Sequence, residues 1–419
     1  MRVLVLGAGV VGMATAYYLW RNGHEVEVID RQAGPGLETS FGNAGGICPS
    51  FAGPWAAPGM ISKVLRLSLQ RNSPIRFSLG LDRRKLSWIR QWLHNCQADK
   101  FRVNKLRMQR VAHYSYKCLK DVVADTGIKN FDFQDAGVLQ VFQTPAELEL
   151  GRISAQALEE HGVPWRLLSN ADINHIEPAL ANSAIQFAGG LHLPADASGD
   201  SYKFVNELAV FLQSKGVRFR YGASVHALDV QGDQICGVAT SQGAITADSY
   251  AVALGSYAPL LVAPLGMKLP VYPLKGYSIT VPITDKSAIA KMALMDEHNK
   301  VMMSCLGNRL RLAGMAELTG YDLTLNEARK KLLIRVATEF FPSGLDLDHV
   351  DFWAGLRPMT PDGPPILGRT PWKNLFLNSG QGSNGWTQAC GTGKIVADLI
   401  SGLPSDIDME GLTIERFHR

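Results

Sequence analysis

The chain has 419 residues, of which 46% are apolar and 19% are charged. A single hydrophobic core stops growing well below this length, so we expect two domains, and the composition excludes a disordered or fibrous protein. No stretch reaches the roughly 18 uninterrupted apolar residues of a membrane-spanning helix, so we expect any membrane contact to be peripheral.

The net charge of +4 is unevenly distributed along the chain. Segment 60–110 holds thirteen basic and two acidic residues, a local charge of +11, so the remainder carries −7. Apolar residues alternate with these charges, which fits either amphipathic helices packed on the core or a surface that contacts anionic lipid. Zinc spacings and known nucleic-acid-binding motifs do not accompany the charge, so we expect no nucleic-acid partner.

The six cysteines are scattered without a Cys-x-x-Cys pair or a histidine at ligand spacing. This pattern predicts neither a disulfide framework nor a metal site, and it is typical of a reducing compartment. Glycines at positions 7, 9 and 12 interrupt the N-terminal apolar run, which argues against a signal peptide. We therefore expect a cytoplasmic protein, with a peripheral contact on the inner face of the cell membrane as a further expectation.

The first thirty residues predict a β-α-β unit. Arg2–Leu6 is a β-branched run, a glycine loop follows, Met13–Arg21 is helical, and Glu25–Ile29 is a second strand that ends at Asp30. Later strands are expected at 138–142, 189–194, 217–221, 224–230, 234–240, 249–254, 271–281, 309–315 and 375–378. Helices are expected at 147–161, 202–215, 327–341 and from about 385 onward.

The glycine loop carries the first chemical signal, Gly7-x-Gly9-x-x-Gly12 between a strand and a helix. Its glycines permit a tight turn, close approach to a pyrophosphate and close packing of the helix on the strand. Val10 and Val11 belong to this loop and are predicted cofactor residues beside the helix N-terminus, which favours anions, and Asp30 can accept hydrogen bonds from ribose hydroxyls. An aspartate rather than an arginine at position 30 argues against a 2′-phosphate, and the adjacent Arg31 is also a predicted cofactor residue.

Further segments are expected to approach the same dinucleotide. A polar loop after the second strand, small residues that end a buried strand, and a glycine-rich turn before the C-terminal helix all suit close approach of the backbone. A helix beginning near Gly385 would direct its N–H groups toward a flavin pyrimidine edge, which favours FAD over NAD. The predicted cofactor residues from these segments are Thr39, Ser40, Asn43, Ala44, Gly45, Val225, Ala253, Gly255, Gly382, Gly385, Trp386 and Thr387.

Arg357 lies between Gly355 and a proline-rich turn. Because a guanidinium can bind a carboxylate through two parallel hydrogen bonds, we interpret Arg357 as the anchor of a substrate carboxylate. The alternative is a salt bridge between domains.

Taken together, these residues resemble the D-amino-acid dehydrogenase family within the glycine, sarcosine and D-amino-acid oxidase group. The resemblance rests on the glycine motif, on Glu38-Thr39-Ser40-x-x-Asn43-Ala44-Gly45, on 54–59, on 272–278 and on 355–363. It implies non-covalent FAD, a carboxylate-binding Arg357, a catalytic pocket residue at Tyr277 with Lys275 nearby, and transfer of electrons to a quinone or another respiratory acceptor. Covalently flavinylated relatives carry a cysteine where this chain has Met359.

Two positions bear on substrate range. Members of the family usually have Gly-His-Gly where this chain has Gly380-Gln381-Gly382, and Cys48 lies in a loop expected near the flavin. We therefore include Gln381 and Cys48 in the expected substrate pocket.

The expected fold is α/β, with a Rossmann-like FAD-binding domain interleaved with an α+β substrate domain that holds a mixed or antiparallel sheet. We assign 1–85, 198–266 and 351–419 to the first domain, and 86–197 and 267–350 to the second. The expected activity is oxidative deamination of D-amino acids. Alternatives are a secondary-amine enzyme acting on D-proline or D-hydroxyproline, a flavoprotein scaffold at a membrane, and an NAD-dependent dehydrogenase.

Overall fold

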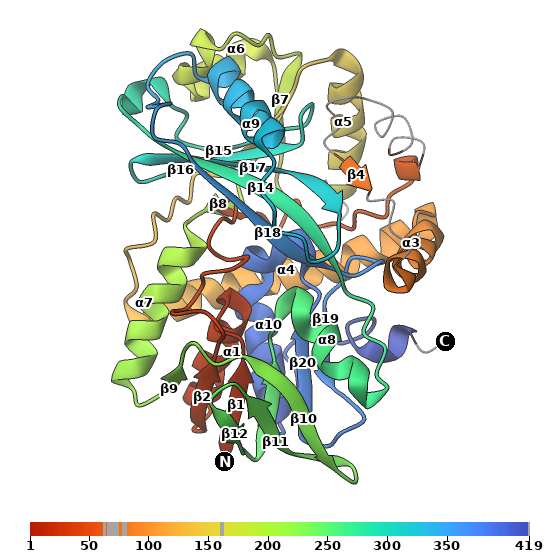
Figure 1. The fold of residues 1–419 in the computed structure, drawn as a ribbon. Coiled ribbons are helices and arrows are strands. Elements are labelled where there is room, and N and C mark those ends of the chain that lie inside the picture. Colours follow the sequence, from red (N-terminus) through yellow and green to blue (C-terminus); the bar gives the residue numbers. More distant parts are fainter. Residues whose placement is uncertain (62–63, 65–74, 78–81, 160–162, 418–419) are drawn as a thin grey trace.

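The structure is a computed structural model that describes residues 1–61, 64, 75–77, 82–159 and 163–417. Two large β-sheets lie one above the other (Figure 1), with both termini beside the lower one. The expected α/β class, with a parallel dinucleotide-type sheet and a mixed second sheet, is confirmed.

The lower sheet has six strands, and all neighbouring pairs are parallel except β19 with β20 at one edge. Val3 and Val5 pack on one face and Leu4 and Leu6 on the other, because side chains alternate along a strand and helices or strands cover both faces. In order the strands are β19 (Ile366–Arg369), β20 (Leu375–Ser379), β13 (Ser249–Val252), β1 (Arg2–Leu6), β2 (Glu25–Ile29) and β9 (Arg218–Arg220).

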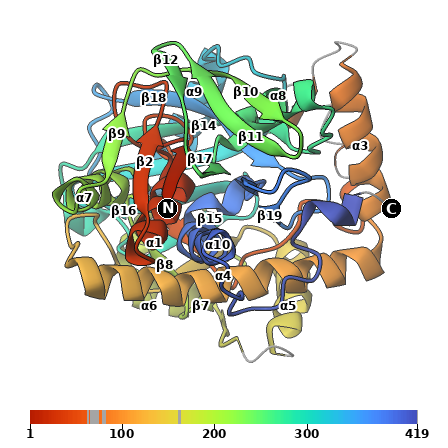
Figure 2. The ribbon, with the colours of Figure 1, turned by 90° about the horizontal axis from the view of Figure 1, so that it is seen from below.

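Helices cover one face of this sheet and a small sheet covers the other. The helices are α1 (Val10–Arg21), α7 (Ser201–Ser214), α10 (Gly385–Ile400) and α4 (Ala98–Thr126). The small sheet comprises β10 (Val225–Gln231), β11 (Gln234–Thr240) and β12 (Gly243–Ile245), beside α8 (Ala258–Val262). Figure 2 shows α4 running across the molecule next to α10.

The upper, mixed sheet has nine strands. In order these are β18 (Asp351–Met359), β14 (Tyr272–Pro282), β17 (Arg309–Leu318), β16 (Val301–Leu306), β15 (Ala293–Asp296), β5 (Val138–Phe142), β7 (Gly189–Leu193) and β6 (Arg166–Leu168), and β4 (Ile75–Phe77) also pairs with β17. Helix α9 (Glu327–Phe340) packs on its outer face. Other elements of the described residues include β3 (Gly46–Ile47), β8 (Ala197–Ser198), α3 (Arg83–Asn95), α5 (Pro145–Glu159) and α6 (Asn170–Ile176).

The places of β18 and α4 differ from the sequence expectations. Arg357 lies within the edge strand β18, which continues to Met359 and so includes the start of the expected proline-rich turn; Pro358 is tolerated there because an edge strand needs fewer backbone donors. Strand β18 therefore belongs to the mixed sheet, whereas α4 packs with the parallel sheet through residues such as Val111 and Leu119. The expected division assigned 351–419, which contains β18, to the FAD-binding domain and 86–197, which contains α4, to the substrate domain. The observed packing of both elements differs from it, because a position in the chain does not reveal which sheet an element joins.

Candidate active site

A pocket of about 1430 Å³, including its opening to solvent, runs along the carboxyl ends of the parallel strands. Its lining begins where β1 and β2 end, passes β13, and reaches Gln381 and Gly385 after β20. The pocket therefore joins the N-termini of two helices, α1 and α10. Ligands of open α/β sheets bind at this edge, and two helix N-termini favour two electron-rich groups.

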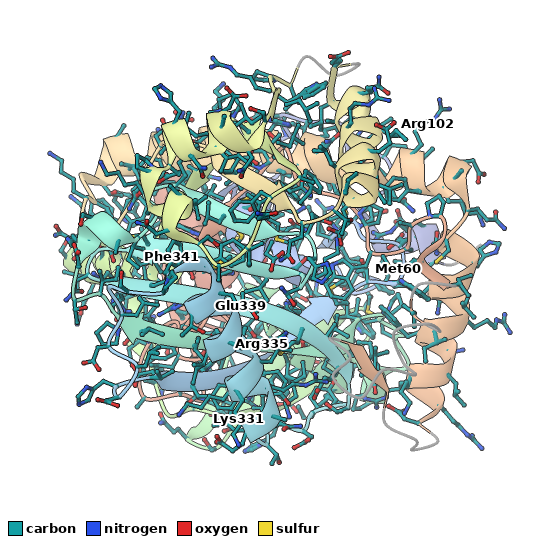
Figure 3. All side chains as sticks on the ribbon, turned by 90° about the horizontal axis from the view of Figure 1, so that it is seen from above. Met60, Arg102, Lys331, Arg335, Glu339 and Phe341 are labelled. Carbon is teal, nitrogen blue, oxygen red and sulfur yellow. The ribbon has the colours of Figure 1, made fainter. Side chains whose placement is uncertain are left out.

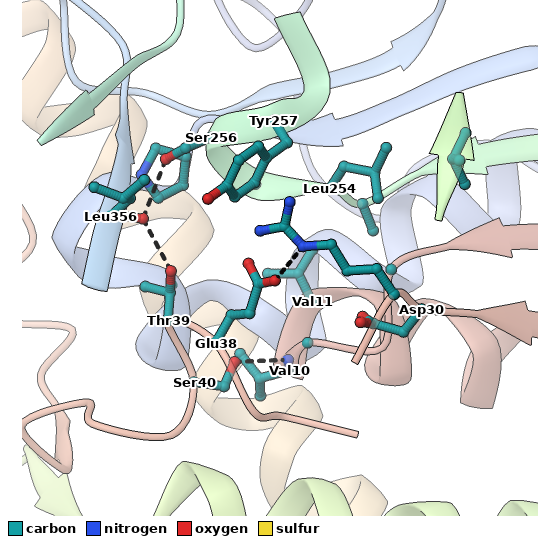
Figure 4. A pocket seen from close by; sticks show the side chains of 18 of the residues that line it. Val10, Val11, Asp30, Glu38, Thr39, Ser40, Leu254, Ser256, Tyr257 and Leu356 are labelled. Carbon is teal, nitrogen blue, oxygen red and sulfur yellow. Dashed lines mark hydrogen bonds and ion pairs between the residues drawn. The ribbon is translucent and has the colours of Figure 1, made fainter. Parts of the chain in front are cut away.

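The glycine loop is shaped by close backbone packing. Gly7 has φ +109°, and a Cβ there would lie 2.5 Å from the Ala253 carbonyl oxygen. A Cβ on Gly12 would lie 1.9 Å from the Gly7 carbonyl oxygen, so this glycine serves helix–strand packing rather than the pocket wall. Ser40 Oγ accepts from the Val10 N–H at 3.0 Å and fixes the loop of Ser40 against the start of α1 (Figure 4).

Asp30 stabilises the loop from within. Its Oδ2 accepts from Ala8 N and its Oδ1 from Gln32 N, both at 2.8 Å. Burial raises the pKa of this carboxyl group, although the two backbone hydrogen bonds act in the opposite direction. Each oxygen keeps a second lone pair, so the carboxylate can still accept from a ribose hydroxyl.

A charged bridge lies in the wall of the pocket. Arg31 Nε donates to Glu38 Oε1 at 2.5 Å, and the Arg31 guanidinium carbon lies 3.8 Å from the centre of the Tyr257 ring. Figure 4 shows the Glu38 carboxylate and the Tyr257 ring facing the same space. Sequence reasoning missed Tyr257, which only the fold brings next to Arg31.

The other end of the pocket is tied together by one carbonyl group. The Leu356 carbonyl oxygen accepts from Thr39 Oγ1 at 2.9 Å and from Ser256 Oγ at 3.1 Å, which joins three distant segments (Figure 4). Nearby, Gln381 Nε2 donates to Asn378 Oδ1 at 2.6 Å. Ser256 follows the carboxyl end of β13 and Asn378 lies in the last two residues of β20, and position at a strand's carboxyl end is the signal that could have identified them.

Most of the predicted cofactor residues line this pocket, together with Gln381. They are Gly7, Gly9, Val10, Val11, Asp30, Arg31, Thr39, Ser40, Val225, Ala253, Gly255, Gly382 and Gly385.

The other predicted cofactor residues are not among those that line the pocket. Asn43 Oδ1 accepts from Gly45 N at 2.8 Å and shapes the turn that contains Ala44. Trp386 Nε1 donates to the Gly199 carbonyl at 3.0 Å, and Thr387 Oγ1 accepts from Cys48 N at 3.0 Å.

Arg357 donates its hydrogen bonds to backbone carbonyl groups. Its Nη1 donates to the Met315 carbonyl oxygen at 2.7 Å, and its Nη2 lies 3.4 Å from the Gly314 carbonyl oxygen. Within the described ranges, no Asp or Glu forms an ion pair with Arg357, so the alternative of an inter-domain salt bridge is not seen there. Burial lowers the pKa of this guanidinium to about 10, yet the side chain keeps some solvent exposure.

Tyr277 and Lys275 lie on the opposite face of the mixed sheet. Tyr277 Oη donates to Glu317 Oε2 at 2.9 Å, and Glu317 pairs with Arg329 of α9. Lys275 Nζ donates to the Thr324 carbonyl at 2.5 Å. The structure therefore does not bring these two side chains to Arg357, because successive residues of a strand point to opposite faces.

Cys48 also lies outside the pocket lining. Its side chain packs with Val138 and Ala293, and burial raises the pKa of the thiol well above its usual value. Arg311, which the sequence did not mark, lies on the face of the sheet that meets the parallel domain. Its Nη1 donates to the Phe41 carbonyl at 2.7 Å and holds the loop between Ser40 and Gly45.

Comparison with known proteins identifies the family. The family model described as "FAD dependent oxidoreductase" (DAO) matches residues 2–399. The chain belongs to this family. It is therefore an FAD-dependent oxidoreductase, and the pocket with its glycine loop and two helix N-termini fits the cofactor.

Solved structures share the fold across almost the full length of the chain. Glycine oxidase from Geobacillus kaustophilus aligns with a TM-score of 0.75 at 21% identity, covering 99% of this chain and 98% of that one. L-proline dehydrogenase from P. horikoshii gives 0.76 at 20% identity, with 100% and 98% covered. L-amino acid deaminase from Proteus myxofaciens gives 0.75 at 14% identity, with 100% and 93% covered.

Helices long and apolar enough to cross a bilayer are absent from the part of the chain that the structure describes. A search of those same residues finds no cluster of three or more His, Cys, Asp or Glu side chains that could hold a metal ion.

Proposed function

We propose that this family member is a D-amino-acid dehydrogenase that converts D-amino acids into 2-oxo acids and ammonia. The observation that carries the proposal is Arg357, a partly exposed guanidinium whose hydrogen-bond partners are neutral carbonyl groups. Neutral acceptors leave the positive charge uncompensated. A substrate carboxylate would supply the missing negative charge through two hydrogen bonds.

The cofactor is proposed to be bound without a covalent link. The N-terminus of α1 would hold the pyrophosphate, Asp30 the ribose and the N-terminus of α10 the flavin end, and bound FAD would accept the hydride. Met359 contributes a thioether near Gly382, which is not the nucleophilic thiol that a covalent flavin link uses.

The residues of this chain would then orient the substrate. Arg357 would fix the carboxylate and leave the Cα–H bond as the reacting bond. Burial of the amine favours its neutral form, which has the lone pair needed for imine formation. The substrate loses a hydride from Cα and a proton from nitrogen, and water hydrolyses the resulting imino acid to a 2-oxo acid and ammonia.

The D configuration is supported by the sequence motifs alone. The similar folds include proteins named for glycine, L-proline and L-amino acids, so the fold accommodates different substrates. Gln381 favours one rival: a buried amide lines the pocket where family members usually have histidine. A secondary-amine enzyme acting on D-proline or D-hydroxyproline is therefore the second candidate.

The test is anaerobic bleaching of the flavin absorbance by D-amino acids, L-amino acids, D-proline and D-hydroxyproline. We expect bleaching by primary D-amino acids. Bleaching by cyclic amines alone would move the assignment to the second candidate. A yellow protein that no amino acid reduces would favour the scaffold alternative, and a colourless one would remove the flavin assignment.

A quinone or another respiratory acceptor is the proposed electron acceptor, reached through a peripheral contact at the cytoplasmic membrane surface. Supporting this, α3 exposes Leu86 and Leu93, at 51% and 41%, on the same helix as the exposed Arg83, Arg84 and Arg90. Helix α3 and the first turns of α4, where Arg102 lies at the margin of the molecule, form one edge of the protein (Figure 3). Part of the basic segment lies outside the described residues.

Vesicle sedimentation tests this contact. We expect binding to vesicles with phosphatidylserine but not to pure phosphatidylcholine, and loss of binding when Arg83 and Arg90 are changed to Glu. Lys331→Glu with Arg335→Glu on α9 is the matched control, because these basic residues lie on a different face (Figure 3). Equal loss in both variants would argue for unspecific charge attraction.

A further inference from the structure

Three neighbouring strands form the surroundings of Arg357. Strand β18 carries Arg357, β14 lies next to it, and β17 is the third strand. The guanidinium donates to carbonyl groups of β17, so the side chain passes over the whole width of β14. Such a path requires free space above β14 and carbonyl groups of β17 that point toward the guanidinium.

Gly276 makes the room. It lies in the middle of β14 opposite Gly355 of β18. A Cβ built on Gly276 would lie 2.5 Å from Arg357 Cζ and 2.6 Å from Nη1. Any side chain at position 276 would therefore occupy the place of the guanidinium.

A β-bulge presents the carbonyl groups. Lys275 pairs with Glu317 and Tyr277 with Gly314, so two residues of β17, Met315 and Ala316, lie opposite the single residue Gly276. Met315 has φ +65°, a left-handed conformation that such bulges usually assign to glycine. The Met315 carbonyl consequently turns toward the face of the sheet on which Arg357 lies, at 2.7 Å from Nη1.

We infer that Gly276 and the Met315 bulge are positioning elements that hold Arg357 in a cradle of neutral carbonyl groups and present it, still charged, to the substrate carboxylate. This inference rests on the proposed function. A carboxylate in the cradle would neutralise the guanidinium internally, whereas carbonyl oxygens satisfy its N–H groups and leave its charge for the ligand. In this proposal Gly276 and Met315 act through Arg357 and do not themselves contact the substrate.

Carboxylate binding to the FAD-loaded enzyme tests the inference without turnover. Propionate and propionamide are titrated by calorimetry and by the change in flavin absorbance, since they match in shape and differ in charge. Gly276→Ala is expected to weaken propionate at least 10-fold, to leave propionamide unchanged and to keep FAD content. Gly237→Ala is the matched control, a strand glycine whose added Cβ would meet nothing closer than 3.5 Å.

A pair of variants at position 315 keeps the test decisive if Gly276→Ala does not fold. Both Met315→Leu and Met315→Val stay apolar, but β-branched valine disfavours the left-handed conformation much more strongly. We expect Met315→Leu to bind propionate within about 2-fold of the wild type and Met315→Val to bind it at least 10-fold more weakly.

Three results would overturn the inference: no propionate binding by the wild type, unchanged affinity in Gly276→Ala, or equal affinities in the two Met315 variants. The two proposals fail separately. If D-amino acids bleach the flavin but Gly276→Ala binds propionate normally, only the cradle is wrong. If no amino acid bleaches the flavin but the variants lose propionate as expected, only the proposed reaction is wrong.

Discussion

Buried ionisable side chains in this protein differ in how their charge is compensated. Glu317 and Arg329 neutralise each other inside the outer layer of the mixed sheet. Arg357 contacts carbonyl groups, and Asp196, fully buried, accepts from Ser50 N with one oxygen. Side chains such as Arg357 and Asp196 respond to ligands or to pH, because no opposite charge within the fold neutralises them.

Tyr277→Phe distinguishes a structural role from a catalytic one. The variant loses the hydrogen bond to Glu317 but leaves the Glu317–Arg329 pair, so we expect unfolding free energy to fall by about 1 kcal/mol. Because Tyr277 faces away from Arg357, kcat/KM for the best D-amino acid should stay within about 3-fold, whereas Arg357→Ala should lower it by at least 100-fold. A 100-fold drop in Tyr277→Phe with unchanged stability would place its hydroxyl in the reaction.

Asp196→Asn should alter the pH dependence of stability. Burial raises the pKa of the Asp196 carboxyl group to about 7 in the folded protein, from 3.8 as the ordinary value. The unfolded chain therefore releases this proton first, and stability contributed by the protonated form is lost as pH rises from about 4 to about 7, by up to about 4 kcal/mol.

The variant keeps the acceptor for Ser50 N and removes the titration. Denaturant unfolding from pH 4 to pH 8 should show a flatter profile in Asp196→Asn, with a gain over the wild type above pH 7. Parallel profiles for the two proteins would show that Asp196 titrates normally in the fold.

At the scale of elements, α10 shows how one helix serves packing and cofactor binding at once. Gly393 faces α1, and a Cβ there would lie 2.8 Å from the backbone of Ala14. Gly385, at the N-terminus of the same helix, lines the pocket, and a Cβ there would meet no protein atom within 4 Å. The two glycines are therefore required for different reasons.

Alanine substitutions at Gly393 and Gly385 should distinguish a role in helix packing from a role in cofactor binding. Gly393→Ala forces α1 and α10 apart, so we expect the apoprotein to lose about 1–3 kcal/mol of stability. Gly385→Ala should leave apoprotein stability within about 0.5 kcal/mol of the wild type and weaken FAD, because the added methyl group enters the pocket. Thermal unfolding of the apoprotein and fluorescence titration with FAD check both. Equal destabilisation by the two substitutions would contradict this assignment.

At the scale of the whole molecule, the pocket couples cofactor binding to stability. Its walls come from 7–40, 223–261 and 356–385, which are distant in sequence. A ligand that binds only the folded chain stabilises it by about 2.7 kcal/mol at a hundred times its Kd. We expect FAD to raise the Tm of the apoprotein by a few degrees, and FMN to raise it less, because FMN lacks the adenosine that would reach Asp30. Equal shifts would place the binding energy at the flavin end alone.

The sequence by itself determined the β-α-β unit, the glycine loop and most strand positions. These signals are local: a β-branched run predicts a strand, and a glycine triplet between strand and helix predicts a dinucleotide loop wherever the chain goes next. The strands expected at 138–142 and 234–240 are confirmed at those bounds, and α1 begins at Val10 rather than Met13 because the helix continues into the loop.

Only the tertiary structure decided which side chains share a site. Arg357, Tyr277 and Lys275 belong to neighbouring strands, but the parity of each strand sends Arg357 to one face and the other two to the opposite face. The bulge at Met315 follows from pairing between β14 and β17, which have different registers on its two sides. The register of a strand, and the face of the sheet to which its side chains point, depend on the partner strand. A shift of one residue in the register moves every side chain to the opposite face, so no local sequence pattern could reveal them.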